Sequence, residues 1–568
     1  MEIKMKRKIT ERNFTPIKST AEYIEVLKKH GDKTIYRYPV GKTYESKSYA
    51  EFTEYMLDLA AGLEALGLGG KRIGVIGETA PEWVATYVAT LASGGVIVPL
   101  DKELDMEAIC GFLENVEAEA VVYGKSYKGK FDAVIGKHPT VKKFITMGDE
   151  ECSEGMMNIS AVVERGKQAR AEKPFAVVER APEDLAVMLF TSGTTGTSKC
   201  VMLCEKNIYS TMNSACQTVE FYPDDTIVSV LPLHHTYELI CMLSGMNYGM
   251  EIGINDSLRH IMKNFAEYKP TGLILVPLFV NTMYDRIMKK IREGKKEGLV
   301  KFMIGLSNFL RKIGIDLRRV FFKQVLDAFG GRLNKIVSGG APLNPEMMKN
   351  FDAFGVTIAE GYGITECSPL IAVNPYYALK SGSVGPAVPS CTVRIDGDKK
   401  NDKGYTEGEI QVKGDNVMLG YYKNDEENAK AFTADGWYRT GDIGYMDEDG
   451  YIYITGRLKS VIVLENGKNV FPEEIEEYLE KIPEVGEVVV VGRKAEDGET
   501  IILTAIVYPS TEIYGETPDK EKAYTEIKAR ILELNRKLPS FKVIKNVEIR
   551  EIPFEKTTSR KIKRHLVK

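Results

Sequence analysis

The sequence predicts a multidomain α/β protein, and three observations support that prediction. The chain has 568 residues, far more than one typical domain, so two or more packed units are expected. From residue 50 onward, short apolar runs alternate with amphipathic helical stretches, a pattern typical of parallel sheets covered by helices on both faces. After about residue 380 the sequence becomes rich in glycine, tyrosine and β-branched residues, which indicates a smaller antiparallel β region.

The first αβ elements are predicted between residues 49 and 101. Residues 49–66 repeat apolar side chains at helical spacing. Residues 72–78 (RIGVIGE) are predicted to form a buried strand, 81–94 a helix with proline in its first turn, and 95–101 another strand. The same strand pattern recurs at LAVMLF (185–190), TIVSVLPL (226–233) and TGLILVPL (271–278).

A third unit with mixed α+β character is expected from about residue 460. Pro472 lies in the first turn of a predicted helix whose apolar stripe is Ile475, Leu479 and Ile482, and acidic residues follow at the positive helix end. The remaining predicted elements are strands at 487–492, 501–508 and 543–549 and a long charged helix at 518–537.

Composition indicates a soluble globular protein. Hydrophobic residues make up 43% and charged residues 27%, and the net charge of −4 gives no general attraction to nucleic acid. Eight cysteines without regular spacing indicate a reducing compartment, and Cys200 and Cys204 are interpreted as buried thiols rather than zinc ligands. The basic N-terminus lacks the apolar core of a signal peptide, and no stretch reaches the ~20 apolar residues of a membrane span. We therefore expect a cytoplasmic protein.

Residues 282–326 are basic and amphipathic and allow two interpretations. The favoured one is a solvated helical insertion whose apolar face packs on the core, because runs of charge usually lie at the surface. The other is an interfacial segment that touches anionic lipid, so that the protein would contact a membrane peripherally.

The segment TSGTTGTSK (191–199) has the composition of an anion-binding loop. It is not a P-loop, because Ser198 and Cys200 stand where that pattern needs Gly and Ser or Thr. A flexible linker is the usual interpretation of such a cluster. Here, however, the apolar runs before and after the loop place it between core elements, so anion binding by its hydroxyls and Lys199 is the better interpretation.

Further segments carry residues suited to a nucleotide and a metal. In SGGAPL (338–343) and GYGITE (361–366), glycines let the backbone approach a planar group, Tyr362 offers a stacking face, and Glu366 offers a carboxylate to Mg²⁺. Taken singly, Tyr362 would be a core aromatic and Glu366 a surface acid. YRTGD (438–442) ends in an aspartate suited to ribose hydroxyls, with Arg457 one strand later.

Two further segments carry candidate functional residues, a histidine pair and a basic loop near the C-terminus. LPLHHTYE (231–238) places a histidine pair after a strand, where α/β enzymes position functional groups. PFEKTTSRKIKR (553–564) is a basic, hydroxyl-rich loop that in isolation would be a frayed tail.

Together these segments resemble the adenylate-forming enzymes, the superfamily of acyl-CoA synthetases, adenylation domains and luciferases. TSGTTGTSK, GYGITE, YRTGD, GRLKS and the terminal lysine loop occur in that family's order and spacing, from about residue 20 to the end. The resemblance implies a large N-terminal domain (1–458) of two αβ subdomains plus a β subdomain. It also implies a small mobile α+β C-terminal domain (459–568) that is joined at a hinge, Lys459.

The resemblance also implies roles for individual residues. Lys561 matches the catalytic lysine, Thr365 would contact the α-phosphate, and His235 would lie at the substrate carboxylate. Glu366 would hold Mg²⁺. The remaining residues would bind ATP or AMP: Thr191, Ser192, Gly193, Thr194, Thr195 and Lys199 at the phosphates, Gly339, Gly340, Ala341, Tyr362 and Gly363 around the adenine, and Asp442 and Arg457 at the ribose. Three residues depart from the family pattern: Ser198, Cys200 and Arg560.

The implied activity is ATP-dependent activation of a carboxylic acid to an acyl-adenylate, followed by transfer to a thiol. VIVLENGKNVFPEEIE (461–476) and LVPLFVNTMYDRIMKKI (275–291) are similar to the long-chain acyl-CoA synthetases, so we expect a medium- or long-chain fatty acid and CoA. The alternatives are a ligase for a carrier protein or for another acid, and a non-catalytic nucleotide-binding scaffold suggested by Arg560. No nucleic-acid partner is expected, and a homodimer is one of the oligomeric states left open.

Overall fold

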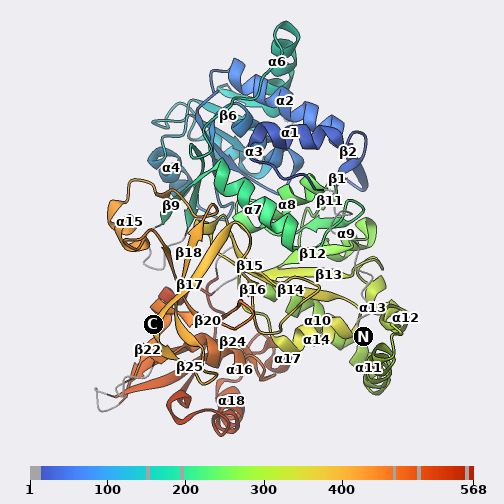
Figure 1. The fold of residues 1–568 in the computed structure, drawn as a ribbon, viewed down its shortest axis with the longest axis vertical. Helices are drawn as coiled ribbons and strands as arrows, with labels where there is room; N and C mark the ends of the chain where they lie inside the picture. Colours follow the sequence, from blue (N-terminus) through green and yellow to red (C-terminus); the bar gives the residue numbers. More distant parts are fainter. Residues whose placement is uncertain are drawn as a thin grey trace. The chain divides into compact units, whose positions relative to one another are not determined.

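Two eight-stranded sheets form the framework of the larger of two units in the chain (Figure 1). The computed structural model describes residues 14–148, 152, 154–191, 198–464, 469–495, 500–556 and 562–567. Of these described residues, the first unit takes in those within 14–191, 198–392 and 413–432, and the second takes in those within 393–412 and 433–567.

The first sheet has the order β19-β9-β8-β4-β3-β5-β6-β7. Strands β8, β4, β3, β5, β6 and β7 run parallel, and β9 and β19 add an antiparallel edge. The bounds are β3 (Arg72–Ile76), β4 (Val96–Pro99), β5 (Ala120–Tyr123), β6 (Lys143–Thr146), β7 (Met156–Asn158), β8 (Leu185–Thr191), β9 (Lys199–Cys204) and β19 (Gly420–Tyr421).

The second sheet has the order β15-β14-β13-β12-β10-β11-β1-β2. It is parallel except for β15 and β2, which pair antiparallel with their neighbours at the two edges. The bounds are β1 (Thr34–Val40), β2 (Thr43–Ser48), β10 (Thr226–Ser229), β11 (Glu251–Ile254), β12 (Gly272–Leu275), β13 (Lys335–Gly339), β14 (Thr357–Gly363) and β15 (Leu370–Val373). A short strand, β16 (Gly385–Pro386), follows.

The helices of the first unit begin where the sequence supplies caps. Ser48 and Glu51 form a capping box at the start of α2 (Tyr49–Ala65), and Pro81 opens α3 (Pro81–Ala92). Besides the helices of residues 277–327, the other α-helices of this unit are α1 (Thr20–Lys29), α4 (Met106–Asn115), α5 (Lys128–Asp132), α6 (Ile159–Glu172), α7 (Glu205–Thr218), α8 (Thr236–Tyr248), α9 (Ile261–Tyr268), α14 (Pro345–Ala353) and α15 (Asp425–Ala431). Helices α7 and α8 pack against each other.

The predicted strand at 226–233 is too long by four residues. Strand β10 ends at Ser229, and the chain then turns so that the His235 N–H donates to the Pro232 carbonyl at 3.1 Å. Proline cannot supply a ladder hydrogen bond, so the apolar run continues as a turn rather than as strand.

Residues 277–327 form four helices: α10 (Pro277–Glu293), α11 (Glu297–Lys312), α12 (Arg318–Phe321) and α13 (Lys323–Asp327). Helix α10 buries Val280, Met283, Ile287 and Ile291 in the core. The interpretation that residues 282–326 place an apolar face on the core is therefore confirmed for α10. In α11, Val300, Met303 and Ile304 pack against the same core but are only partly buried, and Ser307 is the one residue of this helix that is fully buried.

The second unit begins with four antiparallel strands in the order β21-β20-β18-β17. They are β17 (Cys391–Lys400), β18 (Thr406–Gly414), β20 (Tyr438–Met446) and β21 (Tyr451–Arg457), and β22 (Ile462–Val463) and β23 (Asn469–Val470) form a small ribbon. The C-terminal part holds β24 (Val485–Lys494), β25 (Ile501–Pro509), β26 (Ile544–Ile549), α16 (Pro472–Leu479), α17 (Thr511–Tyr514) and α18 (Lys520–Asn535). Apolar side chains of α16 and α18 form one core with this three-stranded sheet.

The predicted α/β class with an antiparallel β region and a small α+β tail is confirmed by this architecture. Within the residues that the structure describes, no helix combines the length and the apolar character needed to cross a bilayer.

Candidate functional site

Two of the glycine-rich segments lie side by side because they follow neighbouring parallel strands. Gly339 ends β13 and pairs in register with Gly361 of β14, so SGGAPL and GYGITE leave the same edge of the sheet. A Cβ on Gly339 would lie 3.2 Å from the ring of Tyr237, and Gly340 has a φ of +87°. Position 339 therefore favours glycine because the Tyr237 ring approaches it closely, and position 340 favours glycine because its backbone is left-handed.

Glu360 fixes the first of these loops to the second strand. This buried carboxylate accepts the Leu343 N–H at 3.1 Å, so the residues between Gly339 and Leu343 are held over the end of β14. Ala341 is exposed, whereas Tyr362 is buried and pairs with Ala372 of β15. The predicted adenine-binding residues of the two loops are thus brought together.

The first turn of helix α8 packs against β13, the strand that ends at Gly339. His235 is its N-cap residue, and the rings of His234 and His235 lie 4.2 Å apart, centroid to centroid. The His234 Nε2 atom is 3.5 Å from Asp101 Oδ1, so the first histidine faces a carboxylate of another segment. Tyr237 donates its hydroxyl to the carbonyl oxygen of Val337 at 3.1 Å, which attaches the start of α8 to β13.

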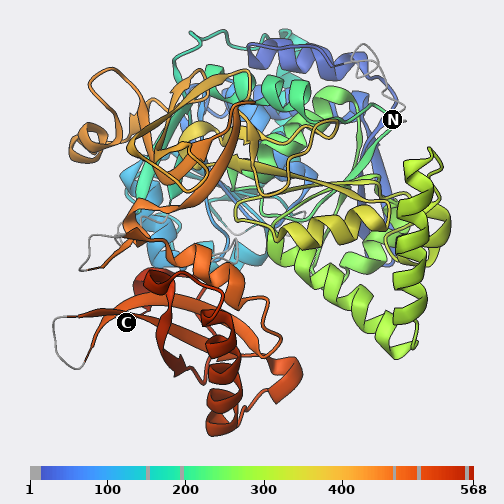
Figure 2. The same ribbon diagram turned by 60° about the horizontal axis from the view of Figure 1, so that its bottom comes forward.

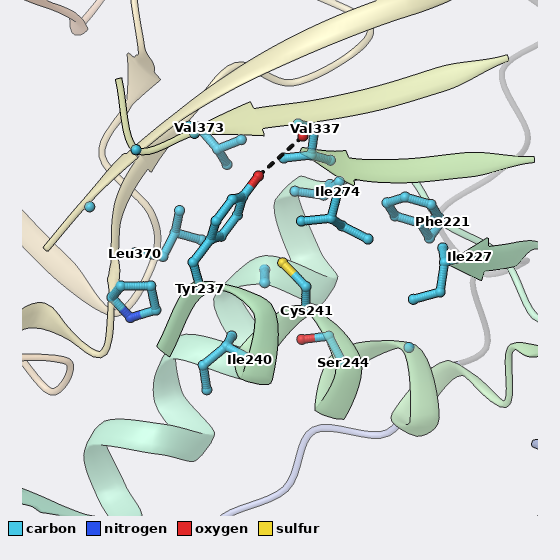
Figure 3. Close-up of a pocket in the computed structure, with 18 of the residues that line it drawn as sticks. Phe221, Ile227, Tyr237, Ile240, Cys241, Ser244, Ile274, Val337, Leu370 and Val373 are labelled. Atoms are coloured by element: carbon cyan, nitrogen blue, oxygen red, sulfur yellow. Dashed lines mark hydrogen bonds between the residues drawn. The ribbon is translucent and has the colours of Figure 1, made fainter. Parts of the chain in front are cut away.

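An apolar cavity of about 110 Å³ lies between α8 and the strands β12 and β13 (Figure 3). That volume is several times the ~15 Å³ that one ordered water requires. Leu370, which pairs with Gly363, lies at one end of the cavity, and Phe221 lies at the other. Between them the wall is formed by Tyr237, Ile240, Cys241 and Ser244 of α8 and by Ile274 and Val337 of the sheet. Not one of the residues that line this cavity carries a charge.

The segment TSGTTGTSK connects the antiparallel strands β8 and β9. Thr191 is the last residue of β8 and pairs with Lys199, the first of β9. Ser192, Gly193, Thr194 and Thr195 lie outside the described residues, as do Gly196 and Thr197. Two of the three departures from the family pattern lie here: Ser198 is exposed, and Cys200 is buried in the core. Burial raises the pKa of the Cys200 thiol to about 12.

The Lys199 ammonium already has partners within the protein. It forms an ion pair with Glu427 of α15 and lies 4.9 Å from the centre of the Tyr421 ring. The hydrogen bond from Lys199 lowers the pKa of Glu427, so this carboxylate is ionised at neutral pH. Lys199 is therefore held by a carboxylate and an aromatic ring, in a position that the sequence did not predict.

Tyr421 connects Lys199 with Glu366. The Tyr421 hydroxyl donates to Glu366 Oε1 at 2.9 Å, and the Glu366 carbonyl accepts the Met418 N–H at 2.8 Å. Glu366 and Thr365 lie in a short 3₁₀ turn after β14, so GYGITE and the base of the β8–β9 connection share one cluster of side chains.

Glu366 fits a magnesium ion that is bound mainly by a nucleotide. Magnesium commonly takes one or two carboxylates together with substrate phosphates, so one hard oxygen ligand from the protein is enough. Within the described part of the chain, no group of three or more His, Cys, Asp or Glu side chains is arranged to hold a metal.

Asp442 and Arg457 are paired partners on adjacent strands of the second unit. They are opposite each other in the β20–β21 register, and Arg457 Nε lies 2.8 Å from Asp442 Oδ1. The aspartate side chain is 3% exposed and the arginine side chain 48% exposed, so the guanidinium holds one carboxylate oxygen from the solvent side. Lys459, the predicted hinge, lies in a 3₁₀ turn that follows β21 directly.

Lys561, the predicted catalytic lysine, and Arg560 lie outside the described residues. The residues on either side of them are paired: Lys556 and Ile562 form an antiparallel bridge, and the Lys556 ammonium lies 2.6 Å from Glu487.

Sequence reasoning missed Glu427, Tyr421 and the cavity. The pattern Asn424-x-x-Glu427 marks the start of a helix, since the Asn424 side chain accepts the Glu427 N–H at 3.2 Å. Nothing in that pattern indicates a partner more than 200 residues away. The cavity walls come from segments scattered between residues 215 and 373, so no single window of sequence shows them.

Comparison with known proteins identifies the family of the chain. Residues 24–422 match the family described as AMP-binding enzyme, and residues 459–568 match the AMP-binding enzyme C-terminal domain. Long-chain-fatty-acid–CoA ligase 1 of Homo sapiens is 31% identical over 498 residues, covering 83% of this chain and 70% of that protein. The long-chain-fatty-acid–CoA ligase FadD15 of Mycobacterium bovis is 28% identical over 483 residues, covering 81% and 78%. ATP-bound MatB from Rhodopseudomonas palustris is similar in structure, with a TM-score of 0.73, 26% identity, and coverage of 97% and 98%. The chain belongs to the AMP-binding enzyme family.

Proposed function

We propose that this protein is an AMP-forming acid–thiol ligase that activates a medium- or long-chain fatty acid with ATP and transfers the acyl group to CoA. The observation that carries the proposal is the uncharged cavity that extends from Leu370, beside Gly363, to Phe221. A cavity lined in this way favours an alkyl chain, because burial of each methylene contributes about 0.8 kcal/mol and the lining offers no charge to a polar acid. The family and the long-chain-fatty-acid–CoA ligases among its relatives support ATP and CoA as the other substrates.

In the first step the substrate carboxylate attacks the α-phosphorus of ATP, and the bond to the β-phosphate oxygen breaks. The products are an acyl-adenylate and pyrophosphate. Two anionic groups must approach each other, so positive charge at the reacting oxygens lowers the barrier. We assign that charge to Lys561, the contact with the α-phosphate to Thr365, and the position beside the carboxylate to His235.

We assign the remaining nucleotide contacts to residues of the glycine-rich loops and of strands β20 and β21. Gly339, Gly340 and Ala341 would border the adenine and Tyr362 and Gly363 would lie at its face, while Asp442, held by Arg457, would accept the ribose hydroxyls. The β8–β9 connection, residues Thr191 to Thr195 with Lys199, would hold the β- and γ-phosphates. Glu366 would hold Mg²⁺, which when bound neutralises phosphate charge.

In the second step the CoA thiolate attacks the acyl carbonyl carbon, and AMP leaves as the bond to its phosphate oxygen breaks. The two steps need different groups at one carbonyl. We therefore propose that residues 459–568 form a domain that moves about Lys459 relative to residues 1–458, withdrawing Lys561 after the first step.

The test is AMP release by the full chain with ATP, Mg²⁺, CoA and straight-chain acids of increasing length. The proposal expects the highest kcat/KM for medium or long chains and no product when a phosphopantetheinylated carrier protein replaces CoA. A preference for acetate or an aromatic acid, or for the carrier protein, would contradict it. A Lys561→Ala variant separates an enzyme from a nucleotide-binding scaffold, since only in an enzyme does adenylation collapse while ATP binding persists.

A further inference from the structure

Helix α11 presents a stripe of large apolar side chains to solvent. Leu299, Phe302, Leu306 and Phe309 of α11 and its C-cap residue Ile313 recur at alternating spacings of three and four residues, and they are 55%, 67%, 37%, 62% and 61% exposed. Nineteen large apolar side chains are exposed in the described part of the chain, and seven of them fall between residues 299 and 320. Exposed apolar side chains that are scattered singly need no explanation, whereas a contiguous group indicates a contact surface.

The outward direction of this stripe is fixed by the opposite face of the helix. Val300, Met303 and Ile304 pack against the core of the unit, and Ser307 is buried. Arg311 and Arg318 both reach Asp352 of α14 at 2.7 Å, which fastens the end of α11 and the start of α12. Because the inner face is attached in this way, the outer stripe is held in place, and α11 and α12 stand at the margin of the unit (Figures 1 and 2).

The surroundings of the stripe are basic. Residues 282–326 hold twelve Lys or Arg against four Asp or Glu, although the whole chain has a net charge of −4. Lys295 and Lys296 precede α11, Lys301 lies in it and Lys312 ends it, and all four side chains are exposed. A helix with Phe and Leu on one face and Lys beside them is the pattern of segments that bind anionic lipid at the membrane interface.

We infer that the outer face of α11, formed by Leu299, Phe302, Leu306, Phe309 and Ile313, docks on the surface of an anionic lipid bilayer. A second copy of the chain would suit the apolar stripe but not its charge, because lysines lie at both ends of α11 and a symmetric contact would bring the basic side chains of one copy close to those of the other. The stripe also covers only about two heptads, fewer than the three or four that indicate a coiled coil. Anionic headgroups complement the lysines, and the apolar side chains enter the acyl boundary.

This inference goes beyond the proposed ligase activity and does not depend on it. If the protein does use a long-chain fatty acid, docking would place it where that acid accumulates, since an apolar chain partitions into the bilayer.

The test uses the full-length protein and sucrose-loaded vesicles of phosphatidylcholine, with or without one quarter phosphatidylglycerol, in the absence of ATP and fatty acid. The protein should sediment with the anionic vesicles and at least tenfold less with the neutral ones. A Phe302→Ser/Phe309→Ser variant should lower the partition coefficient by about tenfold or more. A Lys295→Gln/Lys296→Gln variant should lower it by about fivefold for each lysine. The matched control is Leu532→Ser/Ile552→Ser, which removes two side chains of 55% and 67% exposure from another surface and should bind as the native protein does.

Native-like binding by the Phe302→Ser/Phe309→Ser variant would overturn the inference, as would failure of the native protein to bind anionic vesicles. Sedimentation velocity tests the alternative that a second copy of the chain covers this face. That alternative would hold if the native protein were a dimer, if the Phe302→Ser/Phe309→Ser variant were a monomer, and if the native protein did not bind vesicles. Thermal melting confirms that the variants fold. The rate of AMP release by the variants with a water-soluble acid should equal that of the native protein. Loss of membrane docking is thereby distinguished from loss of enzymatic activity.

Discussion

Replacing Cys241 with phenylalanine should shorten the acids that the protein accepts. Cys241 points into the cavity from α8, between Tyr237 on the side of Leu370 and Ser244 on the side of Phe221 (Figure 3), and Tyr248 further along the helix also lines the cavity. At 1.5 Å per residue, the part of α8 from Cys241 to Tyr248 spans about 10 Å. A phenylalanine ring at position 241 would therefore separate the end near Phe221 from the end near Leu370.

The magnitude follows from the apolar contacts that a long chain would lose. Each methylene excluded from the cavity costs about 0.8 kcal/mol, which is roughly a fourfold loss in kcat/KM. An acid that loses contact for four methylenes should therefore fall about two hundredfold, while an acid short enough to end before residue 241 should change little. The larger side chain costs an estimated ~1–3 kcal/mol in stability, so folding must be checked by thermal melting.

The assay is CoA-dependent AMP release across a series of straight-chain acids. Cys241→Ala is the matched control, because it changes the same position without filling the cavity and should keep the native preference. If Cys241→Phe lowered kcat/KM equally for all lengths, or left the long acids unaffected, the acyl chain would not occupy this cavity and the reasoning would fail.

Three further predictions concern ionisable groups. Glu427→Gln should release Lys199 to bind the phosphates of ATP. The KM for ATP should then fall by up to about fivefold, since a partly exposed ion pair contributes at most ~1 kcal/mol. Steady-state kinetics measures this KM, and a raised value would contradict the prediction. Glu366→Ala should raise the Mg²⁺ concentration needed for half-maximal adenylation without changing the thermal melt, and unchanged Mg²⁺ dependence would remove its assigned role. Burial raises the pKa of Glu238 to about 8, so the folded protein keeps a proton that the unfolded chain releases above about pH 4.5. Its contribution to stability therefore falls as the pH rises from 4.5 to 8, at up to ~1.4 kcal/mol per pH unit, and Glu238→Gln should lose less Tm than the native protein between pH 6 and 8.

The first two of these predictions have a control within the chain. Glu426 lies beside Glu427 and pairs with Lys430 alone among the described residues, so Glu426→Gln should leave the KM for ATP unchanged. Tyr421→Phe removes the hydrogen bond to Glu366 but keeps the carboxylate, so it should retain Mg²⁺ dependence. For Glu238, an equal loss of Tm in native protein and Glu238→Gln would show that this group does not set the pH dependence.

The sequence predicts the parts of the site that are local. The run that ends at Gly339 and the run that continues into Gly361 identify two strands and the loops that follow them. Parallel pairing then brings the two loops together. Asp442 and Arg457 were likewise predicted close together, because one turn joins their strands.

Contacts between distant segments could not be predicted in the same way. The partner of Lys199 is Glu427, on a helix whose own sequence explains only its N-cap. Helices α10 and α11 are both amphipathic, yet α10 buries Ile287 and Ile291 while α11 exposes Phe302 and Phe309. Periodicity shows that a helix has an apolar face, but the neighbours that cover or expose that face are set by tertiary packing.

The most direct test of the account is a crystal structure of the protein with a bound acyl-adenylate of a long-chain fatty acid. The account predicts that the alkyl tail lies between α8 and the strands β12 and β13, with its end toward Phe221. A tail that leaves the nucleotide loops in another direction, with the cavity beside Cys241 unfilled, would contradict it.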